Sequence, residues 1–276
     1  MREDALAAKL AALRAGLNEL GATLLAFSGG VDSSFVLRIA HEVLGGRLTA
    51  LTSVSPTNPE HDTSHAVALA RSLGVRHLLI PSNELEVPGY AANPTNRCYL
   101  CKNRLYEICA AEARRLGIAS IIDGVNADDL ADYRPGLRAA DERGVRHPLV
   151  DSGIGKEHVR ALSRAHGLAS WDRPASPCLS SRFPYGTAIT PESLRMVATA
   201  EDGLRTLGFR TLRVRFHGTL ARVEIDAAEL PHLADSTLRT ALVAVVRAAG
   251  FASVEIDPQG FRSGSLNAGL SGRVHP

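Results

Sequence analysis

The sequence predicts an α/β protein, built on a doubly wound parallel sheet and followed by a small α+β domain. Short apolar runs alternate with helical patterns over the first 120 or so residues, which is typical of a parallel sheet covered by helices on both faces. A glycine-rich loop follows the first apolar run and opens a helix. Beyond about residue 170 the pattern changes to the alternation of antiparallel strands. We therefore expect domains at 1–170 and 190–276, joined by a loop over 171–189.

Composition and charge exclude several classes of protein. The 276 residues are 45% hydrophobic and 22% charged, which is ordinary globular composition. Since 31 Lys and Arg oppose 29 Asp and Glu, the net charge of +2 does not indicate a nucleic-acid or membrane binder. We find no secretory signal and no apolar run of about 18 residues, the length of a membrane span. Four cysteines form no disulfide framework, so we expect a cytoplasmic protein with reduced or metal-bound thiols.

The first domain is expected to alternate helices with strands. The expected helices cover residues 2–20, 31–44, 59–73 and 99–116. The expected strands cover residues 22–27, 48–54, 75–80 and 118–122. For the third helix, Asn58 is the predicted N-cap and Pro59 the first helical residue.

Ligands bind at the carboxyl ends of parallel strands. Three polar segments follow expected strands there: Ser28-Gly29-Gly30, Ser53-Val54-Ser55 and Asp123-Gly124-Val125-Asn126. We expect these segments to form a binding site, with Val54, Gly124 and Asn126 among its contacts.

The second domain is expected to be small and mixed. Its loop, 171–189, is rich in Pro, Ser and Gly and carries Cys178. Thr190-Pro191-Glu192 opens a helix with good capping chemistry. Segments 210–216 and 220–226 alternate like antiparallel strands, and a helix at 237–249 and a strand at 252–257 complete the domain.

The segment Ser28-Gly29-Gly30-Val31-Asp32-Ser33-Ser34 predicts a nucleotide site. Glycines allow the backbone to approach a polyanion, and a helix N-terminus supplies N–H groups and the positive end of its dipole. Ser28, Ser33 and Ser34 add hydroxyl donors, and Asp32 can hold Mg²⁺ on the phosphates. The alternative is a glycine-rich turn with a Ser or Asp cap.

This segment resembles the pyrophosphate loop of the ATP pyrophosphatase superfamily, and no Gly-Lys-Ser/Thr follows it as in a Walker A loop. The resemblance implies cleavage of ATP between its α and β phosphates, with AMP joined to a substrate oxygen. Asp123-Gly124-Val125-Asn126-Ala127-Asp128-Asp129 resembles the second signature of the superfamily. Asp128 and Asp129 are further candidates for Mg²⁺, and a solvated turn is the alternative.

Three of the four cysteines form a candidate sulfur or metal site. Cys98 and Cys101 are a CxxC pair at the start of a helix, between Arg97 and Lys102. Cys109 lies about 12 Å further along that helix, too far to share a single metal, and is expected in the core. With Cys178, the pair leaves a zinc site one ligand short and suits a [4Fe–4S] cluster with one open iron. Three unrelated thiols, or a redox CxxC without metal, are the alternatives.

Taken together, these segments resemble the LarE family of ATP-dependent sulfur transferases over nearly the whole chain. The motifs that carry the resemblance are residues 28–34, Arg97-Cys98-Tyr99-x-Cys101-Lys102, residues 123–129, Tyr133-Arg134-Pro135-Gly136, Gly144-Val145-Arg146-x-Pro148-Leu149, Pro177-Cys178-Leu179-Ser180-Ser181-Arg182, Arg213-Val214-Arg215-Phe216-His217-Gly218 and Gly260-Phe261-Arg262-Ser263-Gly264-Ser265. The cysteine and arginine motifs are more specific to this family than the pyrophosphate loop, which the whole superfamily shares.

The resemblance implies a substrate and a reaction. The substrate is pyridinium-3,5-biscarboxylic acid mononucleotide, whose carboxylates are adenylated and converted to thiocarboxylates for the nickel-pincer cofactor of lactate racemase. ATP, Mg²⁺ and sulfide or another sulfur donor take part. With Cys98 and Cys101 beside Cys178, the chain resembles the branch that holds an iron–sulfur cluster. The resemblance also implies a homo-oligomer, a trimer or a hexamer, with no nucleic acid or membrane as partner.

The arginine motif is a candidate site for the substrate phosphate. Arg213 and Arg215 are two residues apart on an expected strand and therefore share a face. With His217 and Arg182 they can bind a phosphate through paired hydrogen bonds. Glu201 and Glu224 are acids of the same domain, which the resemblance links to metal or substrate. A solvated basic face is the alternative.

Three other functions remain open from the sequence. A tRNA thiolase uses the same loop and cysteine chemistry, although the net charge of +2 argues against a tRNA surface. An ammonia-using synthetase of the GMP or NAD type needs no cysteine triad. A nucleotide-binding regulatory module would show no catalysis.

Overall fold

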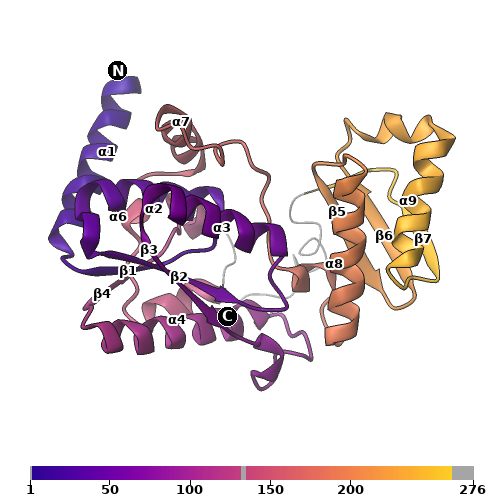
Figure 1. The fold of residues 1–276 in the computed structure, drawn as a ribbon, viewed down its shortest axis with the longest axis horizontal. Coiled ribbons are helices and arrows are strands. Elements are labelled where there is room, and N and C mark those ends of the chain that lie inside the picture. The colour runs from indigo at the N-terminus through magenta and orange to yellow at the C-terminus, as the bar shows by residue number, and fades with distance from the viewer. Residues whose placement is uncertain (1, 132–134, 263–276) are drawn as a thin grey trace. The chain divides into compact units, whose positions relative to one another are not determined.

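The computed structural model describes residues 2–131 and 135–262, which form two compact units. The first unit takes residues 1–87 and 96–176, and the second takes 88–95 and 177–276. The motif residues Tyr133, Arg134, Ser263, Gly264 and Ser265 lie outside the described ranges. Figure 1 labels the elements of both units.

A parallel sheet of four strands forms the centre of the first unit. Its strands are β1 (Thr23–Ala26), β2 (Leu48–Val54), β3 (Arg76–Pro81) and β4 (Ser120–Ile122). Their order is β3-β2-β1-β4, and all neighbours are parallel. A single parallel bridge from Ile122 to Arg146 extends the sheet beyond β4. This order confirms the α/β class with a parallel sheet.

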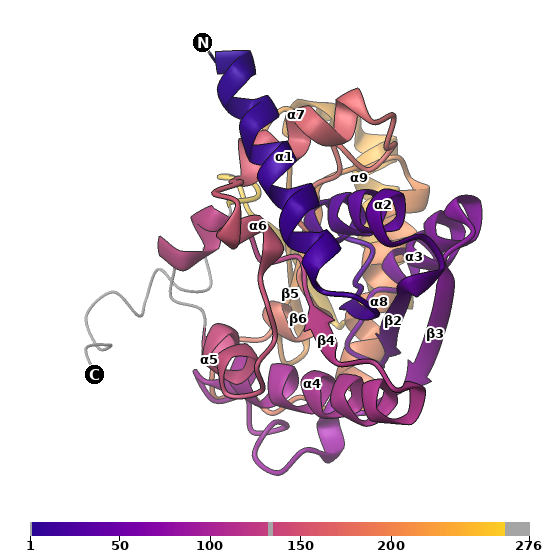
Figure 2. The same ribbon diagram turned by 90° about the vertical axis from the view of Figure 1, so that its left-hand side faces the viewer.

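Helices cover both faces of this sheet (Figures 1 and 2). The helices packed on one face are α1 (Arg2–Glu19), α2 (Val31–Leu44), α3 (Glu60–Leu73), α6 (Pro148–Asp151) and α7 (Lys156–Ala165). The helices on the other face are α4 (Arg97–Leu116) and α5 (Pro135–Asp141). Leu25 of β1 packs into the first layer and Leu24 into the second, as the period of two in a strand requires.

Two helix starts differ from the expectation. α3 begins at Glu60 with Pro59 as its N-cap, and the side chain of Asn58 donates to the Ser53 carbonyl at 2.7 Å instead of capping the helix. α4 begins at Arg97, two residues earlier than expected, so its first two turns contain both Cys98 and Cys101. Short 3-10 turns connect several of these elements: η1 (Gly45–Arg47), η2 (Glu84–Glu86) and η3 (Ala127–Ala131).

The second unit has a three-stranded mixed sheet and two helices. Its elements are η4 (Leu179–Arg182), α8 (Pro191–Thr206), β5 (Leu212–His217), β6 (Leu220–Ile225), η5 (Leu230–Ala234), α9 (Ser236–Ala248) and β7 (Ser253–Ile256). β5 pairs antiparallel with β6 across a turn at Gly218, where φ is 67°, and β6 pairs parallel with β7. Thr190 caps α8 by accepting from the Ser193 N–H at 3.1 Å.

Residues 88–95 belong to the second unit because their side chains bond to it. Tyr90 is buried and shares a 2.7 Å hydrogen bond with the Ser180 hydroxyl. The buried Asn93 amide donates to the carbonyls of Phe183 and Pro184. Within the described ranges, no helix combines the length and apolarity that crossing a membrane requires.

Close packing of α8 on α9 is testable at Gly203. A Cβ added at Gly203 would lie 2.4 Å from Val245 Cγ1, so Gly203→Ala forces Val245 to move. We expect a loss of about 1–3 kcal/mol of unfolding free energy, as for other overpacked sites. The measurement is denaturant unfolding of the full chain.

The control is Gly16→Ala in α1, where no atom lies within 4 Å of the added Cβ. This change is expected to stabilise by up to about 1 kcal/mol through helix propensity. Adding Val245→Ala to the Gly203→Ala variant removes the contacting methyl group and should restore part of the lost stability. Equal effects at the two glycines would contradict the contact.

Candidate functional site

The loop between β1 and α2 has the geometry of an anion site. Gly29 has φ of 74°, a left-handed value that disfavours a side chain, and Gly30 is the N-cap of α2. The Ser28 hydroxyl lies 3.0 Å from that of Ser33 and accepts from the Gly30 N–H at 3.3 Å. These bonds fold the loop over the start of α2, whose first N–H groups lack intrahelical acceptors.

The loop after β4 lies directly against this turn. A Cβ added at Gly124 would lie 2.7 Å from the Ser33 backbone nitrogen, so only glycine allows this approach. In the strand order β3-β2-β1-β4, the chain direction across the sheet reverses between β1 and β4. Open α/β sheets bind ligands at such a switch point. The structure thus brings the two predicted loops into contact at one edge of the sheet.

Two buried polar atoms at the start of α2 suit phosphate and Mg²⁺. In the described part of the chain, Ser34 Oγ and Asp32 Oδ1 have no hydrogen-bond partner. Buried polar atoms nearly always have a hydrogen-bond partner, and the exceptions are places where an ion, a water or a ligand can supply it. A hydroxyl and a carboxylate at a helix N-terminus fit a phosphate and its cation.

Lys156 contacts two of the predicted residues. Its Nζ lies 2.5 Å from Asp32 Oδ2, and its backbone N–H donates to Asp128 Oδ2 at 2.7 Å. Asp129 Oδ2 accepts from the Asn126 N–H at 3.1 Å. Asp32 therefore has a cation beside it at the start of α2, while Asp128 and Asp129 stabilise the start of α7 and their own loop. These contacts favour Asp32 over the other two as a ligand for Mg²⁺.

Val54 lines an open hollow of about 960 Å³. The hollow runs from the end of β2 along the outer side of α3, and its walls include Val54, Ser55, Thr63, Val67 and Arg71. None of its lining residues belongs to residues 28–30 or 123–126. We therefore place the phosphate site by the loops and not by this hollow.

A buried hydrogen-bonded triad, which the sequence did not reveal, lies under the second loop. Asp123 accepts from the Tyr106 hydroxyl at 2.7 Å, and its other oxygen lies 2.7 Å from His147 Nδ1. Burial alone would lower the pKa of His147, but the hydrogen bond and charge of Asp123 outweigh it and raise that pKa. Burial opposes ionisation of Asp123, yet His147 holds the pKa of this carboxyl below its usual value. His147 follows Arg146, whose backbone bridges to Ile122 at the end of β4. His147 therefore lies at the same edge of the sheet as Asp123.

The cysteines of the first unit divide as expected. Cys98 is exposed and Cys101 half-buried, one turn apart at the start of α4, and Cys109 is buried in the core. Burial raises the pKa of Cys109 to about 12, so this thiol stays protonated. Cys178 belongs to the second unit, where it is half-buried and precedes η4. Across residues 2–131 and 135–262, no group of three or more His, Cys, Asp or Glu side chains has the geometry to hold a metal ion.

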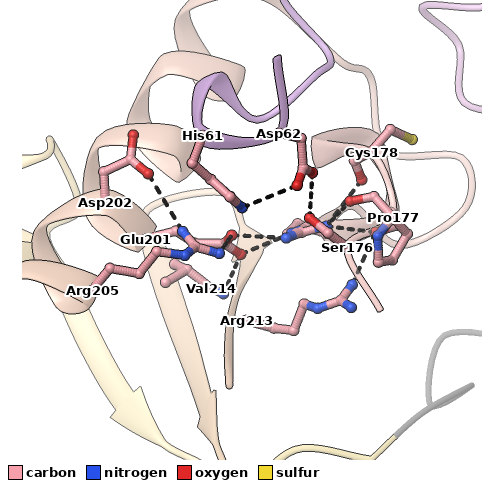
Figure 3. A network of polar contacts seen from close by, with 12 residues as sticks. His61, Asp62, Ser176, Pro177, Cys178, Glu201, Asp202, Arg205, Arg213 and Val214 are labelled. Atoms are coloured by element: carbon pink, nitrogen blue, oxygen red, sulfur yellow. Dashed lines mark hydrogen bonds and ion pairs between the residues drawn. The ribbon is translucent and has the colours of Figure 1, made fainter. Parts of the chain in front are cut away.

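Arg182 is the most buried of the predicted phosphate ligands, with 1% exposed. It forms two hydrogen bonds to Glu201, at 2.8 and 2.7 Å, and donates to the carbonyls of Pro177 and Cys178 (Figure 3). Glu201 also accepts from the Val214 N–H at 3.0 Å. These contacts favour a role for Arg182 in holding the Cys178 backbone, and a role for Glu201 as its counter-ion.

Arg213 and Arg215 share one face of β5 and are buried, with 6% and 8% exposed, which contradicts a solvated basic face. Arg215 binds Glu224 through two hydrogen bonds, at 3.0 and 2.8 Å, and donates to the Ser181 carbonyl. The Arg213 guanidinium lies 5.0 Å from the centre of the Phe261 ring. His217 ends the strand and is exposed.

This cluster holds several guanidinium groups close together. Arg182, Arg213 and Arg215 are buried, and Arg182 pairs with Glu201 while Arg215 pairs with Glu224. Burial and then the charge of Arg182 lower the pKa of Arg213 to about 9. An anion bound there would relieve the repulsion among these guanidinium groups.

Comparison with known proteins agrees with this geometry. Residues 6–88 match the NAD synthase family. Over 96% of this chain and 99% of the other, the protein is 45% identical to an uncharacterized protein from Synechocystis. It is 37% identical, over 96% of both chains, to the pyridinium-3,5-bisthiocarboxylic acid mononucleotide synthase of Lactiplantibacillus plantarum. An ammonia-dependent NAD⁺ synthetase from Aeropyrum pernix is 40% identical over 30% of each chain.

The fold and the two loops define a PP-loop ATP pyrophosphatase, a class related to NAD synthase. Similarity to the Lactiplantibacillus plantarum synthase extends over nearly all of both chains. The chain belongs to the LarE-like family within this class.

The ion pair of His147 with Asp123 is expected to stabilise the fold more at acid pH than at alkaline pH. Because the folded-state pKa of His147 is raised, its contribution is complete below the unfolded pKa of 6.5 and is lost as pH rises through the folded value. We expect His147→Gln to cost about 1.5–3 kcal/mol near pH 6. The cost should be smaller near pH 9, as measured by urea unfolding at both values.

The control is His77→Gln in β3. Burial lowers the pKa of His77, so protonation disfavours its folded state and the sign reverses. Removing His77 should cost less at acid pH than at alkaline pH. Parallel pH dependences for the two variants would contradict a charged His147.

Proposed function

We propose that this protein is an ATP-dependent sulfur transferase acting on pyridinium-3,5-biscarboxylic acid mononucleotide. It adenylates the carboxylates and converts them to thiocarboxylates, as needed for the nickel-pincer cofactor of lactate racemase. The observation that carries this proposal is the whole-length similarity to a synthase whose name describes the bisthiocarboxylic product. The contact between the two loops at the switch point of the sheet supports its ATP-dependent half.

Adenylation solves a leaving-group problem. A carboxylate resists nucleophiles because oxide would have to leave. A carboxylate oxygen attacks the α-phosphorus of ATP, pyrophosphate leaves, and the resulting acyl adenylate has AMP as a weakly basic leaving group. The loops of residues 28–34 and 123–126 hold the phosphates, with Asp32 on Mg²⁺ and Lys156 balancing charge. Sulfur then attacks the carbonyl carbon, and AMP departs with the original oxygen.

The arginines of the second unit bind the phosphate of the substrate. Arg213 and Arg215 supply donors on one face of β5, with His217 at its end. Burial and the charge of Arg182 lower the pKa of Arg213, and this repulsion between guanidinium groups supports an anionic ligand. A metal role for these two glutamates is less favoured, because each already accepts two hydrogen bonds from a guanidinium.

Sulfur delivery falls to Cys98, Cys101 and Cys178. The donor chemistry fits a [4Fe–4S] cluster, since Cys98 and Cys101 present two thiols one helical turn apart beside Lys102. Cys178 is the third ligand in this proposal. When bound, such a cluster supplies sulfide at an iron that lacks a protein ligand. We further propose a cytoplasmic homo-oligomer, a trimer or hexamer, that receives sulfide from a separate donor.

The proposed function is tested with purified protein under anaerobic conditions. The protein is mixed with the substrate, ATP, Mg²⁺ and sulfide, and pyrophosphate and product mass are followed. We expect pyrophosphate release only with the substrate present, and replacement of oxygen by sulfur in the product. Iron and sulfide counts with an absorbance spectrum test the cluster. Pyrophosphate release without thiocarboxylate, or stimulated by tRNA, would contradict the proposal.

Asp32 is expected to be essential for adenylation. Asp32→Ala removes the carboxylate beside Lys156 and the Mg²⁺ ligand, so pyrophosphate release should fall by at least about a hundredfold, a loss of about 2.7 kcal/mol. Bound iron and the brown colour should be unchanged. The control is Asp202→Asn on the exposed side of α8, which should leave the rate unaltered. An unchanged rate in Asp32→Ala would exclude this role.

Cys178 is expected to act after adenylation. Cys178→Ala should release pyrophosphate at a rate close to that of the wild type, but form no thiocarboxylate. Cys109→Ala is the matched control, because this buried thiol has a pKa raised to about 12 and cannot deliver sulfur. That control should form thiolated product. Product formation by Cys178→Ala, detected by mass spectrometry, would refute the assignment.

A further inference from the structure

The segment that leads to Cys178 is tied to α3 by a partly buried ion pair and to the glycine loop by a hydrogen bond. Arg173 donates from Nη2 to Asp62 Oδ1 at 2.8 Å and from Nη1 to the Gly29 carbonyl at 3.1 Å. Ser176 donates from its hydroxyl to Asp62 Oδ2 at 2.6 Å, a contact drawn in Figure 3. All four residues belong to the first unit. One carboxylate therefore fixes both ends of residues 173–176.

Asp62 is well placed to sense the loop. It lies in the first turn of α3 with 9% exposed. A Cβ on Gly29 would lie 2.8 Å from the Asp62 carbonyl oxygen, so the glycine loop packs directly on this turn. Since Arg173 bonds to Gly29 and Asp62 together, a shift of the loop changes the acceptors of Arg173.

A second helix holds the same segment. Arg160 of α7 donates to the carbonyls of Trp171 and Arg173, at 2.7 and 2.9 Å. The helix begins with Lys156, whose Nζ lies 2.5 Å from Asp32 Oδ2. α3 and α7 both contact the nucleotide loop at their first turns. Both helices also form hydrogen bonds to residues 171–176.

We propose that Arg173 and Asp62 are positioning residues that couple occupancy of the ATP site to the segment carrying Cys178. Cys178 follows Ser176 by two residues, so this anchor sets the point at which the chain continues toward the cysteine. Neither residue takes part in the chemistry itself. The inference rests on the proposed function for its consequence, that a formed adenylate is captured by sulfur before water hydrolyses it.

The test compares Arg173→Met and Asp62→Asn with a control, Arg164→Met. Arg164 lies over the Trp171 ring at 5.0 Å and so contacts the same segment. The measurement is hydrogen exchange of peptides covering 171–182, with and without a non-hydrolysable ATP analogue. In the wild type and in Arg164→Met, we expect the analogue to slow exchange by about tenfold, as a 1.4 kcal/mol change would. In the other two variants this slowing should be lost.

The second readout is the ratio of AMP to thiocarboxylate formed. It should rise several-fold in Arg173→Met and Asp62→Asn, while the KM for ATP and the rate of pyrophosphate release stay within about twofold. Arg173→Lys keeps the charge near Asp62 and should recover part of the coupling. Should a variant not fold, Ser176→Ala keeps the ion pair and should show a smaller loss of the same slowing.

Three outcomes are decisive. Unchanged slowing by the analogue in Arg173→Met and Asp62→Asn, or in Ser176→Ala if those do not fold, overturns the coupling. Slowing lost equally in Arg164→Met overturns it too, because general loosening of the segment would explain that result. If no variant, nor the wild type, forms thiocarboxylate, the proposed function fails, whereas the exchange data still decide the coupling.

Discussion

The approach of Gly124 to the backbone of Ser33 is the contact on which the nucleotide site depends. It brings the loop after β4 to the first turn of α2, at the switch point between β1 and β4 where the strand order reverses. Only a residue without a side chain allows this distance, and only a parallel sheet places both loops at one edge. The unpartnered oxygens of Asp32 and Ser34, seen among the described residues, then lie where the positive end of α2 favours phosphate.

Charge in the two units is arranged differently. In the first, Lys156 pairs with Asp32 and His147 with Asp123, so ionised groups are matched one to one beneath the loops. In the second, the buried guanidinium groups of Arg182, Arg213 and Arg215 lie close together, and burial with neighbouring charge lowers the pKa of Arg213 to about 9. Such an arrangement costs stability and is tolerated where an anion is to be bound. The arrangement in the second unit supports a phosphate-bearing substrate, whereas Arg182 already donates to Glu201 and to the Cys178 carbonyl.

The sequence predicted what local pattern determines. α2 has the expected bounds, and the strands lie within a residue or two of theirs, because apolar periodicity and glycine stops define them. The partners of polar residues were not predictable. Lys156 lies 124 residues from Asp32, and Arg173 lies 111 from Asp62, so no spacing rule links them. His147 was missed because nothing in the local sequence links a lone histidine to Asp123, and the burial of Arg182 was not predictable because a basic residue type does not indicate burial.

In the proposed reaction, AMP is attached to a substrate carboxylate and is then displaced by sulfur. Labelling the carboxylate oxygens of the substrate with heavy oxygen, and following the label by mass spectrometry, tests this order of steps. We expect one labelled oxygen in AMP for each thiocarboxylate formed, with unlabelled pyrophosphate. Label found in inorganic phosphate, or AMP without label beside thiolated product, would contradict it.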